Sequence, residues 1–377
     1  MRRLMFDRRL VYHFDGLLLL TVLAIAALGT TTVYSATYTA SAPYSHPIAW
    51  RQVAWATAGV IAALAMVTFD YRKLERWAYV FYAAGLCLLL AVPIIGTVGN
   101  GSRRWIGVGS FSIQPSEMMK LAYILAMARY FHRKVRPDGL RLLDLAVPLA
   151  LTLPPMALIV AQPDLGTAGV FGFVFVSMVL LAGLNTRTLG LIAGAALLAI
   201  PVFPMLLAHL KPYQLKRLTT FLHPEMDALG AGYHVIQSKI AIGSGQMWGK
   251  GFLQGTQNQL NFLPEQHTDF IFSVFAEEWG FGGGCVLIAL YLALMLRGLI
   301  IVSRAKERFG ALLAFGIIAN VFWQAAINIG MTAGLLPVVG ITLPFFSYGG
   351  SSLVTLMAAL GLVINVNMRR FLFDRYH

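Results

Sequence analysis

Residues 257–284 read QNQLNFLPEQHTDFIFSVFAEEWGFGGG, a proline-broken polar loop that passes directly into an apolar run typical of a membrane span. His267, Thr268 and Asp269 lie at the crossing point. A carboxylate at the mouth of a membrane helix is costly to desolvate, so it is expected to have a partner or a chemical task. The alternative is a simple helix cap, in which Thr268 or Asp269 accepts the first free N–H groups of the helix. Position alone does not decide between these two interpretations.

The composition of the whole chain predicts a polytopic membrane protein. Of its 377 residues, 58% are hydrophobic and 12% are charged, whereas a soluble domain carries about 25% charged residues. The net charge of +13 does not indicate nucleic acid as a partner, because basic excess in a membrane protein is typical of cytoplasmic loops and contacts with membrane lipids. Cys87 and Cys285 both lie in apolar runs, so neither a disulfide framework nor a cysteine metal site is expected.

Ten apolar runs are long enough, or nearly so, to cross about 30 Å of hydrocarbon. We therefore expect an all-α polytopic membrane protein, a single transmembrane domain over residues 1–377, with about ten transmembrane helices. A large extracytoplasmic loop, residues 210–268, is expected between spans seven and eight. The runs lie at approximately 15–37, 49–69, 76–97, 115–132, 144–161, 167–184, 188–209, 269–296, 309–334 and 343–367.

The distribution of lysine and arginine predicts the orientation in the membrane. The terminal segments and the loops on their side hold more than twice as many of these residues as the opposite loops. Both termini are therefore expected in the cytoplasm. In the outer loop, Tyr233, Ile236 and Ile240 recur at helical spacing, which predicts a helix in the membrane interface. The glycine-rich run GSGQMWGKG (243–251) can approach a phosphate with its backbone, although a plain turn is the simpler interpretation.

Charged residues gather near the expected outer face. Glu117 and Lys120 lie three residues apart on the fourth expected span, so they share a helix face as a stabilising ion pair or as part of a site. Asp164, in the turn 162–167, either caps the next helix or faces the same site. Glu277 and Glu278 are expected to be structural, with one of them bonded to a neighbouring helix. The cations near this face are Arg103, Arg104, Lys120, Lys216, Arg217, Lys239 and Lys250.

Carboxylates and cations beside lipid suit chemistry on an anionic lipid headgroup such as a diphosphate. The cations can neutralise the phosphates while a carboxylate acts as a base. A transporter for such a lipid would use similar residues, so the residues by themselves leave both functions open. His267 lacks a second ligand at workable spacing and is interpreted as part of a polar loop.

Several motifs together resemble the SEDS family of shape, elongation, division and sporulation proteins. They cover nearly the whole chain and are specific in order and spacing: RRWIGVGSFSIQPSE, QPDLGT, GYHVIQSKIAIGSG, GKGFLQGTQNQLNFLPEQHTDFIF, LPVVG and PFFSYGGSS. The chain is more similar to the rod-shape branch of the family than to the division branch. The resemblance implies a ten-span peptidoglycan glycosyltransferase that polymerises lipid II on the outer face of the bacterial cytoplasmic membrane during elongation. It also implies a class B penicillin-binding protein as transpeptidase partner, together with other elongation-complex membrane proteins.

Residue by residue, the resemblance implies Asp269 as the catalytic carboxylate, acting as general base in an inverting transfer. It implies a polar cavity whose substrate-binding residues are Arg104, Glu117, Lys120, Asp164 and Lys239. The departing diphosphate would be stabilised by the cations among them or by a divalent ion such as Mg²⁺ or Mn²⁺. No compact ligand motif decides the metal question. Two rival functions remain, a lipid II flippase and a non-catalytic scaffold of the cell-wall synthesis complex.

Overall fold

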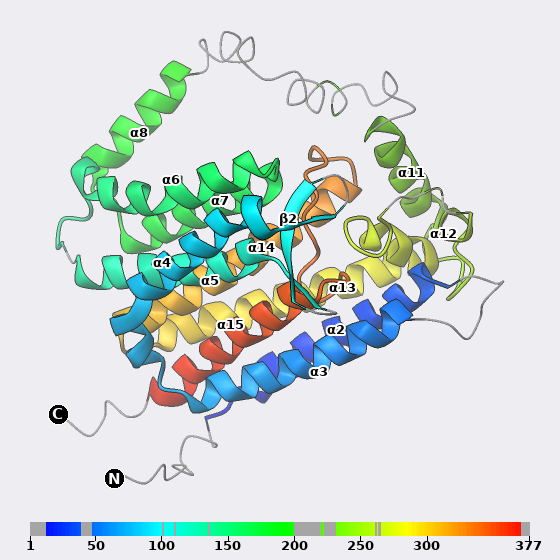
Figure 1. Cartoon of the computed structure of the whole chain (residues 1–377), viewed down its shortest axis with the longest axis horizontal. Coiled ribbons are helices and arrows are strands. Elements are labelled where there is room, and N and C mark those ends of the chain that lie inside the picture. The colour runs from blue at the N-terminus through cyan, green and yellow to red at the C-terminus, as the bar shows by residue number, and fades with distance from the viewer. Residues whose placement is uncertain are drawn as a thin grey trace.

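The computed structural model describes residues 13–38, 47–99, 102–108, 111–134, 136–199, 219, 221, 231–260, 262 and 265–370. In this part of the chain nearly all regular structure is helical, which confirms the expected all-α class. Long helices lie side by side as a bundle (Figure 1), and a small antiparallel sheet is added to it.

The helices are α2 (Gly16–Ala36), α3 (Pro47–Thr68), α4 (Tyr71–Ile95), α5 (Pro115–Arg133), the 3-10 turn η1 (Leu142–Leu145), α6 (Ala146–Ala161), α7 (Leu165–Ala182), α8 (Thr186–Ala199), α11 (Ala231–Ser244), α12 (Thr256–Gln259), α13 (Ile271–Arg304), α14 (Arg308–Thr332) and α15 (Gly350–Arg369). The strands β1 (Thr97–Gly99), β2 (Ser102–Val108) and β3 (Phe111–Ile113) pair in the order β1-β2-β3. This sheet, between α4 and α5, was not expected from the sequence.

Within the described residues, 8 helical segments are long and apolar enough to cross a membrane, which makes the chain a multi-pass membrane protein. They are α2, α3, α4, η1 with α6, α7, α13, α14 and α15. The two other expected spans correspond to α5, which carries Glu117, Lys120 and several basic residues, and to α8, described over 14 residues. The total of ten spans therefore stays a prediction.

Several expected boundaries differ from the observed ones: α4 begins at Tyr71 instead of 76, and α13 ends at Arg304 instead of 296. Two further differences lie next to each other in the fold. The eighth run was expected from residue 269, but α13 begins at Ile271. The tenth run was expected from residue 343, but α15 begins only at Gly350. The difference arises because Ser347 folds the preceding segment into a turn: its hydroxyl accepts the N–H of Leu343 (2.8 Å) and donates to the carbonyl of Thr268 (2.6 Å). This turn joins the start of α15 to the segment before α13.

α15 packs lengthwise against α3 through small residues. A Cβ on Gly361 would collide with the backbone of Ala63, and a Cβ on Gly59 would lie 2.9 Å from the side chain of Met357. Glycine at these positions lets the two helix backbones approach closely, and dispersion contacts then hold the helices together in a lipid environment. α14 and α15 are the most buried of the candidate spans.

α13 is interrupted at Gly280, whose backbone angles (φ 65°, ψ −166°) are non-helical and suit only glycine. A broken helix in a membrane leaves peptide groups without partners unless neighbouring backbone supplies them. The glycine-rich run 243–251 does this through backbone hydrogen bonds of 2.8–3.0 Å between residues 246–251 and 277–282. Gly249 is needed because a Cβ there would collide with α13. The run is thus a turn paired with α13, in agreement with the simpler interpretation.

Glu277 and Glu278 have structural contacts, as expected. Oε1 of Glu277 accepts hydrogen bonds from Nζ of Lys250 (2.6 Å) and from the N–H of Gln257 (3.1 Å). Oε1 of Glu278 accepts a hydrogen bond from the hydroxyl of Ser35 on α2. Both glutamates are buried and join α13 to its neighbours.

The helix expected around residues 233–240 is present as α11, and the face that packs on the bundle is separate from the stripe expected in the membrane interface. Val235 and Ser238 are buried, whereas Ile240 is 45% exposed. The hydroxyl of Ser238 lies 2.6 Å from that of Ser273 on α13 and donates to the carbonyl of Thr332 on α14 (2.6 Å). α11 therefore packs onto the bundle with one face, and an interfacial position of its other face stays a prediction. Most of the loop before α11 lies outside the described residues.

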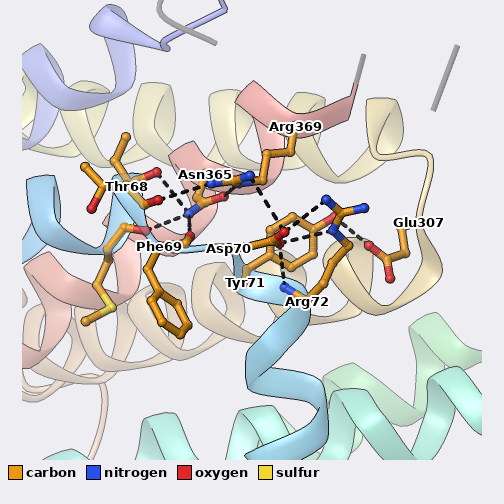
Figure 2. Close-up of polar contacts among 10 residues, drawn as sticks. Thr68, Phe69, Asp70, Tyr71, Arg72, Glu307, Asn365 and Arg369 are labelled. Atoms are coloured by element: carbon orange, nitrogen blue, oxygen red, sulfur yellow. Dashed lines mark hydrogen bonds and ion pairs between the residues drawn. The ribbon is translucent and has the colours of Figure 1, made fainter. Parts of the chain in front are cut away.

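Figure 2 shows the polar contacts that close the turn between α3 and α4. Asn365 on α15 is fully buried, and its amide group donates to the carbonyls of Met66 (2.6 Å), Val67 (3.1 Å) and Phe69. Its Oδ1 accepts a hydrogen bond from Nε of Arg369 (2.7 Å). The last carbonyls of a helix have no partner within the helix, so one side chain here satisfies several groups that would be costly to leave unpaired.

The same turn is held by charged groups. Arg72 donates two side-chain hydrogen bonds to Asp70 (3.0 and 3.1 Å), and Tyr71 donates to Glu307 (2.8 Å) at the start of α14 (Figure 2). Burial alone would raise the pKa of Asp70, but the hydrogen bonds from Arg72 and the positive charge of Arg369 outweigh it and lower the pKa below its usual value. Asp70 is therefore ionised at neutral pH.

We expect Asn365→Ala to lower the stability of the folded protein by about 2 kcal/mol, because it leaves buried carbonyl groups unpaired. The thermal midpoint of the detergent-solubilised protein measures this effect. Asn367→Ala is the matched control, since the side-chain amide of Asn367 donates to one carbonyl, that of His13 (3.1 Å), where Asn365 donates to three. Equal midpoints for the two variants would contradict the role given to Asn365.

Candidate active site

A cavity of about 650 Å³ lies at the end of the bundle where α7, α13 and α15 begin. Segments far apart in the sequence form its wall: β2, the turn before α7, residues 265–269, the loop 338–342 and the start of α15. Its charged residues are Arg104, Asp164, Glu265 and Asp269, with His267 beside them. A cavity of this size with a few convergent polar groups is typical of a site for a small molecule or headgroup.

Asp269 does not cap α13. The N-cap residue is Phe270, and among the described residues this helix start has no side-chain cap hydrogen bond. The hydroxyl of Thr268 donates instead to the carbonyl of Glu265 (3.2 Å). The capping interpretation is therefore wrong for both residues, and the half-buried carboxylate of Asp269 lies on the cavity wall.

The backbone of Asp269 is held in place by Asn328 of α14. The fully buried side-chain amide of Asn328 donates to the carbonyls of Asp269 (2.9 Å) and Ile341 (2.6 Å). One side chain thereby joins the segment that carries the acid to the loop opposite it. Charged or polar groups in such a position need a rigid frame, because the geometry of a site decides its chemistry.

Burial raises the pKa of Asp269 to about 6, and the negative charges of Glu265 and Asp164 act in the same direction. Arg104 and a hydrogen bond from Thr268 lower the pKa but do not offset the burial. A carboxylate with a pKa near 6 is still ionised at neutral pH and is a stronger base than an ordinary aspartate. The sequence left the direction of this shift open, and the tertiary surroundings decide it.

Asp164 has both of the roles considered for it. It is the N-cap of α7, with Oδ1 accepting the N–H of Thr167 (3.1 Å), and it is 3% exposed. Its Oδ2 lies 3.6 Å from Nη1 of Arg104. Arg104 also donates to the carbonyls of Gln162 (3.0 Å) and Pro163 (2.6 Å). The guanidinium group therefore binds the whole turn before α7 and faces the cavity with it.

The pair Glu117–Lys120 does not line the cavity. Both residues are 5% exposed, and Nζ of Lys120 donates to Oε1 of Glu117 (2.8 Å). Oε2 of Glu117 is buried and has no hydrogen-bond partner among the described residues. Gln114 does line the cavity, so the pair lies about one helical turn deeper along α5. The structure places the pair beneath the cavity, and a role in substrate binding stays a prediction.

Lys239 also lies away from the cavity lining. Its side chain is exposed on α11 and covers Gly334, where a Cβ would collide with it. Of the cations expected to neutralise a diphosphate, Arg104 is therefore the one that the described residues bring to the wall.

Two wall residues were not identified from the sequence. Glu265 precedes Asp269 by four residues, and a second carboxylate at that spacing was the available signal. Gly340, in the motif LPVVG, has a positive φ of 69°, and a Cβ there would lie 3.3 Å from Oδ2 of Asp269. Glycine at this position leaves room for the carboxylate, which no local pattern indicates.

A divalent ion is compatible with the cavity. Mg²⁺ is usually bound by one or two carboxylates together with substrate phosphates, and Glu265 and Asp269 repel each other electrostatically on the same wall. These two side chains would hold the ion. Elsewhere in the described residues, Glu75, His132 and Glu307 have ligand atoms within 4.8 Å of one another, near the turn between α3 and α4.

The fold and the cavity define a multi-pass membrane protein with an acid and arginine site at one end of its helices. The chain belongs to the FtsW/RodA/SpoVE family of cell cycle proteins, whose family model matches residues 15–371. It is 40% identical to the peptidoglycan glycosyltransferase MrdB of Escherichia coli K12, over 96% of either chain. It is 36% identical to the peptidoglycan glycosyltransferase RodA of Treponema pallidum, over 96% of this chain and 99% of the relative.

The fold is also similar to a solved structure described as showing the coordination of polymerization and crosslinking by a peptidoglycan synthase complex. The TM-score is 0.78 at 38% sequence identity, over 95% of this chain and 98% of the other. The family identified from the motifs is thereby confirmed.

Proposed function

We propose that this protein is a peptidoglycan glycosyltransferase that polymerises lipid II, with Asp269 as its general base. One observation supports this most: an aspartate with a pKa of about 6 lies on the wall of a 650 Å³ cavity. The chain around it is 40% identical to a peptidoglycan glycosyltransferase.

The proposed reaction joins two lipid-linked sugars. The 4-hydroxyl oxygen of the acceptor attacks the anomeric carbon of the donor and inverts its configuration, while the bond from that carbon to the diphosphate oxygen breaks. Asp269 takes the proton of the hydroxyl, and the bonding electron pair leaves with the polyprenyl diphosphate. A base with a pKa near the working pH combines sufficient ionisation with sufficient proton affinity, which makes such a carboxylate effective.

Arg104 has a positioning and electrostatic role in this proposal. Its guanidinium group is bonded to two carbonyls of the turn before α7 and lies 3.6 Å from Asp164. The guanidinium group also lines the cavity, and its positive charge lowers the pKa of Asp269. Fixed positive groups of this kind stabilise the charge that develops on a leaving diphosphate.

We place the cavity on the outer face of the bacterial cytoplasmic membrane, with both termini in the cytoplasm. The basic excess on the terminal side of the sequence supports this orientation. We further propose a class B penicillin-binding protein as transpeptidase partner, since a similar structure is described as a synthase complex that coordinates polymerization with crosslinking.

The direct test supplies the purified protein with fluorescently labelled lipid II, with and without the transpeptidase, and separates the products by gel electrophoresis. Glycan polymer made by the wild-type chain supports the proposal. A lipid II flippase would move labelled lipid across vesicle membranes and make no polymer, and a scaffold would do neither. Either result, obtained with the partner present, would overturn the proposed function.

The pH dependence of polymerisation follows from the pKa of Asp269. Because the pKa is about 6, the base is protonated below pH 6, and the rate should fall about tenfold for each further pH unit. Glu265→Gln removes a negative charge that raises this pKa, so the acid limb of the profile should move to lower pH. Initial rates between pH 5 and 8 measure both effects.

Glu75→Gln is the matched control for the pH profile, because Glu75 lies on α4 near the opposite end of the bundle. Its acid limb should coincide with that of the wild type. A wild-type rate that stays constant from pH 7 down to 5 would contradict Asp269 as a base that titrates near 6.

A further inference from the structure

The carbonyl groups of residues 267–269 each accept a hydrogen bond from a donor outside their own segment. The first accepts the backbone N–H of Tyr348 (3.0 Å), and the second accepts the hydroxyl of Ser347 (2.6 Å). The third, which belongs to Asp269, accepts the side-chain amide of Asn328 (2.9 Å). The segment that carries the proposed base is therefore held by donors from the turn before α15 and from α14.

The N–H groups of the same segment share one acceptor. Those of Thr268 and Asp269 both lie 3.1 Å from the carbonyl oxygen of Glu265. The carbonyl of Thr268 and the N–H of Asp269 belong to one planar peptide group. Ser347 thus holds one side of the peptide group that precedes the Cα of Asp269, and the carbonyl of Glu265 holds the other side.

The orientation of this peptide group decides where the side chain of Asp269 points. The backbone has two soft dihedral angles per residue, so a peptide group that is fixed on both sides sets the direction of the next Cα–Cβ bond. The peptide group that follows is held at its carbonyl by Asn328. Asp269 therefore lies between two fixed peptide groups, one held by Ser347 and the other by Asn328.

Ser347 itself is buried behind the cavity wall. It is 5% exposed and lies outside the cavity lining, although the next residue, Tyr348, belongs to that lining. Its hydroxyl also accepts the N–H of Leu343 (2.8 Å), and its carbonyl accepts the fully buried amide of Gln52 on α3 (3.1 Å). An effect of Ser347 on the chemistry must therefore pass through the backbone of Thr268.

We propose that Ser347 is a positioning residue for the reaction: its hydroxyl holds the carbonyl of Thr268 and thereby directs the carboxylate of Asp269 into the cavity. This inference rests on the proposed function of Asp269 as general base. A displacement of about 1 Å at a reacting group can cost about 100-fold in rate. The alternative is a hydroxyl that only stabilises the turn before α15, and the two roles differ in measurable ways.

Ser347→Ala should reduce kcat for polymerisation of lipid II, measured with the transpeptidase present, by about 10- to 100-fold, while KM changes by less than about twofold. The acid limb of the rate should move to lower pH, because a loosened carboxylate is better hydrated and loses part of the burial that raises its pKa. A serine that only stabilised the turn would change the amount of folded enzyme and leave the acid limb in place. An acid limb at the wild-type position would overturn the proposal.

Ser347→Cys separates the hydrogen bond from the shape of the side chain, because a thiol is a weak donor. It should lose activity as Ser347→Ala does, and a wild-type kcat would overturn the proposal. Ser238→Ala is the matched control: Ser238 is fully buried, and its hydroxyl also donates to a carbonyl at 2.6 Å, that of Thr332. This control should keep the wild-type kcat and acid limb. Equal losses of kcat in the two alanine variants would count against a specific role of Ser347.

Hydrogen exchange of the backbone amides tests the same contact without activity. Peptides that cover residues 265–270 should exchange at least about tenfold faster in Ser347→Ala than in the wild type or in Ser238→Ala. If Ser347→Ala does not accumulate, Gln52→Ala, which removes the support behind Ser347, should accelerate exchange in the same peptides. Unchanged exchange would overturn the proposal. Absence of polymer from the wild type would instead contradict the proposed function, and exchange would still decide whether Ser347 holds the segment.

Discussion

Asp269→Asn should abolish detectable glycan polymer from purified protein, a loss of at least about 100-fold in the initial rate. A general base contributes 10²–10⁴-fold to a rate, or roughly 3–5 kcal/mol, and the amide cannot take up a proton. Shape and most hydrogen bonding are preserved, so the side chain still fits the cavity. Because Asp269 does not cap α13, no helix-capping energy is lost.

The same variant should be at least as stable as the wild type. The pKa of Asp269 is about 6 in the folded protein and about 3.9 in an unfolded chain. Above pH 6, ionisation of Asp269 therefore lowers the free energy of unfolding. This loss of stability becomes smaller as the pH falls from 6 toward 4, because Asp269 becomes protonated in the folded protein. A neutral asparagine removes the cost at pH 7, so the thermal midpoint should be unchanged or higher.

Asp138→Asn is the matched control, since Asp138 is exposed in the turn before η1 and outside the cavity. It should make polymer at the wild-type rate. Near-normal polymerisation by Asp269→Asn, together with a normal thermal midpoint, would falsify the assignment and direct attention to Asp164 or Glu265 on the same wall.

Gly340→Ala should reduce kcat/KM for lipid II by about 10- to 100-fold, although it adds a single methyl group. The new Cβ would lie 3.3 Å from Oδ2 of Asp269, closer than an ordinary van der Waals contact. The carboxylate must then move away, and a displacement of 1 Å at a reacting group can cost about 100-fold in rate. The φ of 69° at this position adds a backbone strain of about 1–2 kcal/mol for alanine.

Gly183→Ala separates the two effects. Gly183 has a φ of 89°, and a Cβ there would meet nothing within 4 Å. This control should lose a similar amount of stability and retain full activity. Equal activities of the two alanine variants would contradict the inferred contact between Gly340 and the base, while leaving the role of Asp269 itself untouched.

Part of the site was predictable because two of its acids lie in local sequence patterns that indicate a chemical role. Asp269 and Asp164 each follow a polar turn at the edge of an apolar run, where a carboxylate is costly. Gly340 and Asn328 were not predictable, because their importance depends on which segment lies opposite them. Lys239 is an example of a residue that a motif assigned to the site but the fold does not bring to the cavity wall. Val235 and Ser238 form the buried face of α11, so Lys239 lies on the exposed face of this helix.

By itself, the sequence determined the membrane class, the approximate spans and the family. Apolar runs longer than the hydrocarbon thickness have few alternatives to a helix in lipid, so composition and length are sufficient. Only the tertiary structure decided which acids share the cavity, that burial sets the pKa of Asp269, and that the glycine-rich run pairs with the break in α13. Each of these depends on contacts between residues distant in sequence, whose distances and electrostatic environment no local pattern contains.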